Sequence, residues 1–212
     1  MTPLKVLLVE DSDSDAGLVM RVLRRGGFDP TFRRVETAQD MVAALATPDW
    51  NVVISDYNLP EFDAPSALDV LQAAKSDLPF IVVSGNIGED SAVKLMKRGA
   101  SDYILKDSLA RLPAVVQREL AELHTRRQLK QSESHLRLAA KVFESSREAI
   151  VITNAQRCIV SANRAFVEIT GFQLDEVLDQ SIALLNAANE DHELLKNMWL
   201  ASAACAEASF DP

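Results

Sequence analysis

The 212-residue chain has few of the features that mark disulfide-linked, disordered or membrane-spanning proteins. Its two cysteines, Cys158 and Cys205, fit no metal-ligand spacing and are compatible with a reducing compartment. Seven glycines and eight prolines argue against long disordered tracts. No apolar run is long enough to span a bilayer, and the N-terminus lacks the pattern of a signal peptide. We therefore expect a cytoplasmic protein with no membrane segment.

Positive charge is also scarce, because 22 Lys and Arg residues face 31 Asp and Glu residues, which gives a net charge of -9. Nucleic-acid binding is therefore not expected, since phosphate backbones need a basic surface. An acidic chain does suit a site that collects a divalent cation. The 48% hydrophobic residues are enough for a buried core, and the length fits one large or two small domains.

The first half of the chain alternates short apolar runs with segments of helical periodicity. Strands are expected at residues 4–9, 31–35, 52–56, 80–84 and 102–106. Helices are expected at residues 14–25, from Thr37 to 45, at 66–75 and at 89–97. Such alternation predicts an α/β fold, in which a five-stranded, doubly wound parallel sheet has helices on both faces.

Polar residues close the predicted strands: Glu10 and Asp11 the first, Asp56 the third, Ser84 the fourth and Lys106 the fifth. In an open parallel sheet these ends meet at one edge, where ligands bind. Nearby carboxylates repel one another unless a cation joins them, and Mg²⁺ is the natural complement. A carboxylate can also act as nucleophile toward phosphorus, with a lysine and a metal neutralising the transferred group.

At these strand ends the sequence resembles the receiver domain of response regulators in two-component systems, over residues 4 to about 120. Four motifs carry the resemblance: Leu8–Asp11, Ile54–Pro60, Val82–Gly85 and Asp102–Lys106. Each motif alone is weak, but four in the right order, each closing a strand, are specific. The resemblance implies a flavodoxin-like fold and phosphoryl transfer from a sensor histidine kinase or a phosphotransfer protein.

The resemblance also implies a Mg²⁺ site. Asp11 would be a direct ligand, Glu10 would bind through water, and Asp56 and the backbone carbonyl of Asn58 would complete the protein ligands.

Roles in phosphoryl transfer follow from the same resemblance. Asp56 would be the phosphoacceptor, Ser84 and Lys106 would contact the phosphoryl group, and Gly85 would keep the approach to Asp56 open. Tyr103 would be the aromatic switch that turns inward when Ser84 moves toward the phosphate.

A different class, the haloacid-dehalogenase-type phosphatases, shares some of these features. Asp11-Ser12-Asp13 after an apolar strand resembles the start of that family, with Ser84 and Lys106 as later motifs. Asp11 would then be the nucleophile, but Asp56 is left without a role and no acid pair closes a later strand. The receiver interpretation is therefore favoured.

Residues 107–145 contain no glycine and are rich in helix-forming residues, which predicts an extended linker helix. Leu109, Leu112 and Val116 fit one heptad phase. The second phase is carried by Leu129, Ser132, Leu136, Ala139 and Phe143. A continuous coiled coil would need a stutter between the two phases. A homodimer through this helix is expected, and the alternative is a single helix packed on its own domain.

Residues 146–212 resemble an incomplete PAS domain that follows a receiver domain at 1–120 and the linker helix. The resemblance is carried by Ala149–Thr153, Ile159–Asn163, Ala165–Phe166 and Thr170–Phe172. A hairpin, a helix stopped by Gly171, and helical pieces at 174–178, 183–186 and 192 to about 204 are expected, while the last three strands of the PAS sheet are missing. No cofactor is assigned here, because Arg164 replaces the cysteine of flavin-binding relatives and His192 is expected to be solvated.

Phosphorylation at Asp56 is therefore expected to change the conformation of the receiver, and the linker helix is expected to carry this change to the PAS-like segment. In the larger proteins that this sequence resembles, in which a PAS domain follows a receiver domain, the output domain is usually a diguanylate cyclase, a cyclic-diguanylate phosphodiesterase or a histidine kinase. None of their motifs occurs in this sequence, so the output is expected elsewhere. The alternative is an interaction module that dimerises and binds partners without control by phosphate.

Overall fold

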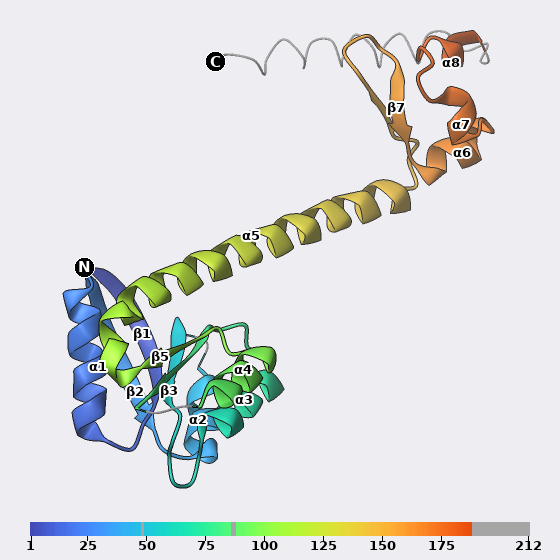
Figure 1. Cartoon of the computed structure of the whole chain (residues 1–212). Coiled ribbons are helices and arrows are strands. Elements are labelled where there is room, and N and C mark those ends of the chain that lie inside the picture. The colour runs from blue at the N-terminus through green and yellow to red at the C-terminus, as the bar shows by residue number, and fades with distance from the viewer. Residues whose placement is uncertain (48, 86–87, 188–212) are drawn as a thin grey trace. The chain divides into compact units, whose positions relative to one another are not determined.

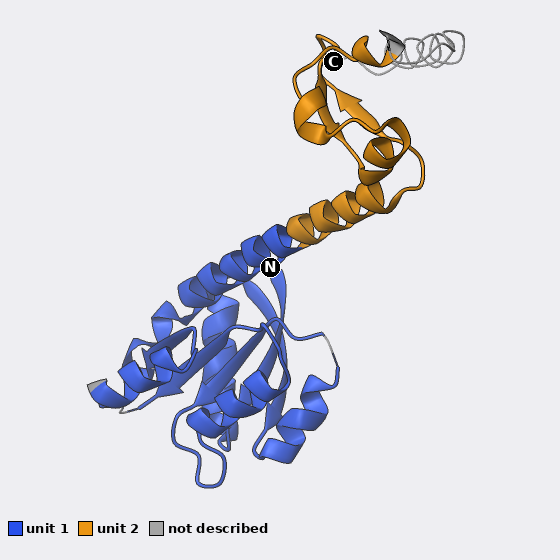
Figure 2. Cartoon of the chain, turned by 90° about the vertical axis from the view of Figure 1, so that its right-hand side faces the viewer, with its two compact units in different colours: residues 1–130 blue, residues 131–212 orange. Residues whose placement is uncertain are grey.

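The computed structural model describes residues 1–47, 49–85 and 88–187. The chain forms two compact units, residues 1–130 and residues 131–212 (Figure 2). Of the helices in the described ranges, none is both long and apolar enough to cross a membrane.

The first unit is built on a parallel sheet in the order β2-β1-β3-β4-β5 (Figure 1). The strands are β1 (Thr2–Val9), β2 (Phe28–Val35), β3 (Val52–Asp56), β4 (Phe80–Ser84) and β5 (Asp102–Leu105). The predicted five-stranded parallel sheet is therefore confirmed. One strand end differs, because Lys106 does not close β5 but begins the 3-10 helix η1 (Lys106–Arg111).

Helices follow the strands in the predicted alternation. They are α1 (Asp13–Arg25), α2 (Ala38–Leu45), α3 (Ala64–Ala73), α4 (Glu89–Lys97) and α5 (Leu112–Ser145). Ser12, Thr37 and Asp63 cap α1, α2 and α3, and each side chain accepts a hydrogen bond from a backbone N–H of the first turn. The caps fix where each helix leaves the sheet edge.

Both faces of the sheet are buried, as the continuous apolar strands require. Successive residues of β1 alternate between the two sides. Val6 and Leu8 belong to a core cluster shared with α1 and the start of α5. Leu7 and Val9 belong to a second cluster shared with α2, α3 and α4.

Helix α5 has 34 residues and begins at Leu112, because residues 106–111 form η1 instead of extending the helix to 107. Its first turns are packed on the sheet, with Leu112 and Val116 buried. Two ion pairs add to this packing within the first unit: Arg118 pairs with Asp102 at 2.7 Å, and Arg127 pairs with Asp77 at 2.5 Å.

The second unit contains an antiparallel hairpin followed by short helices. Its elements are β6 (Val151–Thr153), β7 (Ile159–Ala162), α6 (Arg164–Thr170), α7 (Leu174–Val177) and α8 (Leu184–Ala187). Gly171 ends α6 in the left-handed region, at φ 79°, where glycine carries no steric cost. Ile159, Phe166 and Val177 lie in its small core. The helix expected at 192–204, with His192 and Cys205, lies outside the described residues.

Candidate functional site

Four strand ends of the first unit bring polar side chains to one edge of the sheet. Asp56 is the last residue of β3 and Ser84 the last of the adjacent β4. Glu10 follows β1, and Lys106 follows β5. The side chains are not simply solvated, because Glu10, Asp56 and Ser84 are only 3%, 8% and 1% exposed. Polar groups this deeply buried need a partner or a function.

Lys106 lies between two carboxylates. Its Nζ donates a hydrogen bond to Asp56 Oδ2 at 2.8 Å and another to Asp15 Oδ2. Burial favours the neutral amine, but the hydrogen bonds to Asp15 and Asp56 outweigh burial and raise the pKa of Lys106 above its ordinary value. Lys106 is therefore a fixed cation beside Asp56.

Glu10, Asp15 and Asp56 form a carboxylate cluster, in which one oxygen of each lies within 4.8 Å of the others. Burial, together with the nearby charge of Asp56, raises the pKa of Glu10 to about 7, although the backbone N–H of Ser12 donates to Glu10 Oε1 at 3.0 Å. Such a cluster in this fold is typical of a Mg²⁺ site, because hard divalent cations prefer carboxylate oxygens.

Other residues expected at the site surround this cluster. Asp11 is exposed and is not one of the three clustered acids. Asn58 is exposed, and its backbone N–H approaches Asp56 Oδ1 at 3.4 Å. Tyr103 is exposed on β5. Ser84 Oγ is buried and finds no hydrogen-bond partner among the described residues.

Asp15 was not foreseen from the sequence. It lies in the first turn of α1, and its partner Lys106 is 91 residues away along the chain. One signal was available, because Asp15 lies in the first turn of the helix that directly follows the acidic end of β1. An acid in that position after a strand end can face the same edge of the sheet.

The second unit has a buried polar centre of its own, Asn163, which is 0% exposed. Its Oδ1 accepts from the backbone N–H groups of Ile150 at 2.8 Å and Phe166 at 3.0 Å. Its Nδ2 donates to the carbonyls of Phe143 at 3.0 Å and Glu148 at 2.9 Å. One side chain thus joins the end of α5 to the hairpin and to α6.

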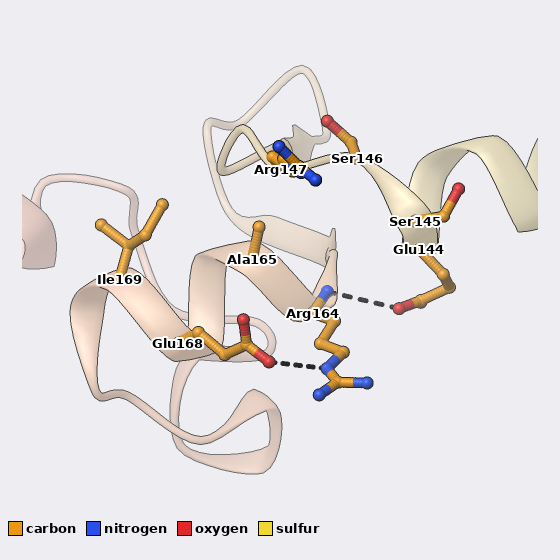
Figure 3. A pocket seen from close by; sticks show the side chains of 8 residues that line it. All are labelled: Glu144, Ser145, Ser146, Arg147, Arg164, Ala165, Glu168 and Ile169. Atoms are coloured by element: carbon orange, nitrogen blue, oxygen red, sulfur yellow. Dashed lines mark hydrogen bonds and ion pairs between the residues drawn. The ribbon is translucent and has the colours of Figure 1, made fainter.

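A pocket of about 290 Å³ lies beside this centre, between the last turn of α5 and α6 (Figure 3). Arg164 connects its walls: the backbone N–H donates to Glu144 Oε2 at 3.3 Å, and Nε donates to Glu168 Oε1 at 2.6 Å. The remaining lining residues are Ser145, Ser146, Arg147, Ala165 and Ile169. This pocket carries the Arg164–Glu168 ion pair, whereas the acids of the first unit are crowded together.

Comparison with known proteins assigns each unit to a family. The response regulator receiver domain matches residues 6–117, and the PAS fold matches residues 138–206.

Individual relatives agree with this assignment. The chain is 27% identical over 158 residues to the cell cycle transcriptional regulator CtrA of Caulobacter vibrioides, covering 72% of this chain and 67% of CtrA. It is 33% identical over 121 residues to the response regulator protein FleR of Pseudomonas aeruginosa, covering 56% of this chain but 25% of FleR. A signal receiver domain from Vibrio parahaemolyticus superimposes with a TM-score of 0.53 at 27% identity, covering 61% of this chain and 98% of that domain.

Proposed function

We propose that Asp56 accepts a phosphoryl group from a histidine kinase or a phosphotransfer protein, because this chain belongs to the response regulator receiver domain family and continues into a PAS fold. The observation that carries the proposal is the 2.8 Å contact between Asp56 and the Lys106 ammonium, beside two further acids. A lone aspartate at a strand end is usually a helix cap, but Asp56 is buried and faces a fixed cation.

The proposed reaction is an in-line transfer. A carboxylate oxygen of Asp56 forms a bond to phosphorus while the bond from phosphorus to the donor histidine nitrogen breaks, and the electron pair leaves with the imidazole. Lys106 neutralises charge on the transferred oxygens, and the free hydroxyl of Ser84 donates a hydrogen bond to one of them. Both groups are already at the sheet edge before the phosphoryl group arrives.

Mg²⁺ would be held by Asp11, Asp56 and the Asn58 carbonyl, with Glu10 acting through water. When bound, it would offset the negative charge shared by the acids and the phosphoryl group. The donor set fits this ion, since all the side chains are carboxylates, and burial together with the nearby charge of Asp56 raises the pKa of Glu10. A cation at this position would lower the pKa of Glu10 again.

The test is phosphorylation by acetyl phosphate and Mg²⁺, followed by mass spectrometry. Asp56→Asn should abolish the adduct. Asp63→Asn is a matched control: Asp63 caps α3 by accepting from Ser66 N at 2.9 Å, a role that asparagine also fills, so labelling should persist. Labelling that survives Asp56→Asn but disappears with Asp11→Asn would contradict the proposal and favour the phosphatase alternative.

The proposed output path runs from residues 1–120, acting as the receiver, through 107–145 to the PAS-like residues 146–212. Tyr103 follows Asp102, whose carboxylate pairs with Arg118 of α5 at 2.7 Å, so a shift of Tyr103 in β5 would reach α5 directly. Hydrogen exchange with and without phosphorylation tests this path. Unchanged exchange beyond residue 120 would contradict the relay and leave phosphorylation intact.

A second candidate function is dimerisation that does not depend on phosphate. Leu129 and Leu136 of α5 are 61% and 70% exposed and lie one heptad apart, which favours a seam with a second copy of the chain. Light scattering before and after phosphorylation separates the two functions. A dimer whose mass and partner affinity do not respond to phosphorylation would favour the second.

A further inference from the structure

An acid at the position of Asp15, in the first turn of a helix, would ordinarily be explained as part of the helix cap. The structure does not support this explanation. An acid at the third position of a helix usually completes a capping box by accepting from the backbone N–H of the cap residue. In α1 the cap is Ser12, and its N–H already donates to Glu10 Oε1 at 3.0 Å. The Asp15 carboxylate instead accepts from Lys106 Nζ, so its contact is with the site and not with its own helix.

We propose that Asp15 is a positioning residue that holds the Lys106 ammonium beside Asp56 before the phosphoryl group arrives. The inference rests on the proposed function and adds a residue to it. Ser12 Oγ accepts from Asp15 N at 3.3 Å, so the helix cap fixes the backbone of Asp15 at the site. Lys106 carries a long flexible side chain on a 3-10 turn, and one carboxylate alone would leave it more conformers than two do.

This arrangement makes Asp15 different from the other first-turn acid of α1. Asp13 is exposed and pairs with Arg34 at 3.1 Å, away from Lys106. Both acids face the positive end of the helix dipole. Asp13→Ala therefore removes comparable helix stabilisation without changing Lys106, and it is the matched control.

The experiment measures the initial rate of phosphorylation by acetyl phosphate and Mg²⁺ at Asp56. We expect Asp15→Ala to lower this rate about 10-fold, because a misplaced catalytic group loses alignment with the reacting atoms. Asp15→Asn keeps a hydrogen-bond acceptor and should fall between wild type and Asp15→Ala. Asp13→Ala should react at the wild-type rate.

A double-mutant cycle shows whether Asp15 acts through Lys106. In a Lys106→Ala background, Asp15→Ala should cause no further loss. An Asp15→Ala rate equal to or above wild type would overturn the proposal, because it would mean that the charge of Asp15 opposes the phosphoryl group. A loss that persists without Lys106 would overturn it as well.

A second readout does not depend on phosphorylation. Acetic anhydride modifies accessible lysine amines, and peptide mass spectrometry measures the rate at Lys106. We expect faster acetylation of Lys106 in Asp15→Ala than in wild type or Asp13→Ala; an equal rate would overturn the positioning role. If wild type takes no phosphoryl label at all, the proposed function fails, and the acetylation result still decides the role of Asp15.

Discussion

Asn163 in the second unit and Ser84 in the first are both buried polar side chains at the end of a β-strand, yet their surroundings are opposite. Asn163 makes four hydrogen bonds to backbone groups of the elements around it. Ser84 Oγ makes none with the described residues, and the neighbouring acids crowd around one lysine.

The difference separates a structural centre from a reactive one. A buried amide with every donor and acceptor satisfied fixes one conformation, because any rearrangement breaks several hydrogen bonds together. A buried hydroxyl without a partner and a buried acid with a raised pKa, as at Glu10, are costly, and such groups are typical of sites that wait for a ligand. The two centres therefore predict opposite responses to mutation.

Replacement of Asn163 should have the largest effect on stability. Asn163→Ala removes all four hydrogen bonds of the side chain. The Phe166 N–H still donates to the backbone carbonyl of residue 163 at 3.1 Å and the Glu148 carbonyl still accepts from Ser146 Oγ at 3.3 Å, but the N–H of Ile150 and the carbonyl of Phe143 lose this partner, and each buried group left unsatisfied costs about 1 to 3 kcal/mol. We expect a loss of at least about 3 kcal/mol, which is enough to unfold a unit with so small a core. Hydrogen exchange of residues 146–187 measures it.

Asn154→Ala is the matched control. Asn154 Oδ1 accepts from the N–H groups of Gln156 and Cys158 in an exposed turn, where water replaces the lost contacts. This change should cost less than about 1 kcal/mol. Equal losses at the two asparagines would refute the structural role of Asn163.

The next largest effect on stability is expected at Glu10, and this effect depends on pH. Its pKa is raised from 4.5 to about 7 in the folded protein, so the folded chain holds a proton that the unfolded chain releases. The contribution of Glu10 to stability is therefore fully present below pH 4.5 and is lost as the pH rises through 7. Glu10→Gln should remove this slope and be more stable than wild type at pH 8 by about 1 to 3 kcal/mol.

Urea unfolding of metal-free protein at several pH values measures the Glu10 effect. Wild type and Glu10→Gln should have similar stability near pH 4.5 and diverge above it. Adding Mg²⁺ at pH 8 should stabilise wild type more than the variant. Parallel pH curves for the two proteins would show that the environment of Glu10 does not penalise its charge.

The sequence predicted those parts of the fold that local patterns determine. Continuous apolar runs identified β1, β3 and β4, since a strand buried on both faces leaves no alternative pattern. Asp56 and Ser84 fell on the observed ends of β3 and β4, while Glu10 and Lys106 lie one residue beyond β1 and β5. Leu112 and Val116, which the sequence placed in one heptad phase, are buried in the core of the first unit.

Long-range contacts explain what the sequence did not predict. Asp15 meets Lys106 only because α1 and the end of β5 approach the same edge of the sheet, and spacing along the chain does not encode this. Asn163 was read as part of a strand motif and a helix start, because its four partners are backbone groups. The second heptad phase at Leu129 and Leu136 remains a prediction of dimerisation, since it is exposed.

The smallest effect on stability is expected at Ser84, and it is the most direct test of the contrast between Ser84 and Asn163. Ser84→Ala removes a buried hydroxyl that has no hydrogen-bond partner within the described ranges, so the free energy of unfolding should stay the same or rise by less than about 1 kcal/mol. Ser55→Ala is the matched control, because Ser55 Oγ, equally buried on the adjacent strand, donates to the Asp56 carbonyl at 2.9 Å. That change should cost about 1 kcal/mol or more in urea unfolding.

A loss at Ser84 as large as at Ser55 would show that its hydroxyl stabilises the fold. An unchanged stability combined with slower phosphorylation of Asp56 would mean that this hydroxyl serves the ligand, as the contrast with Asn163 requires.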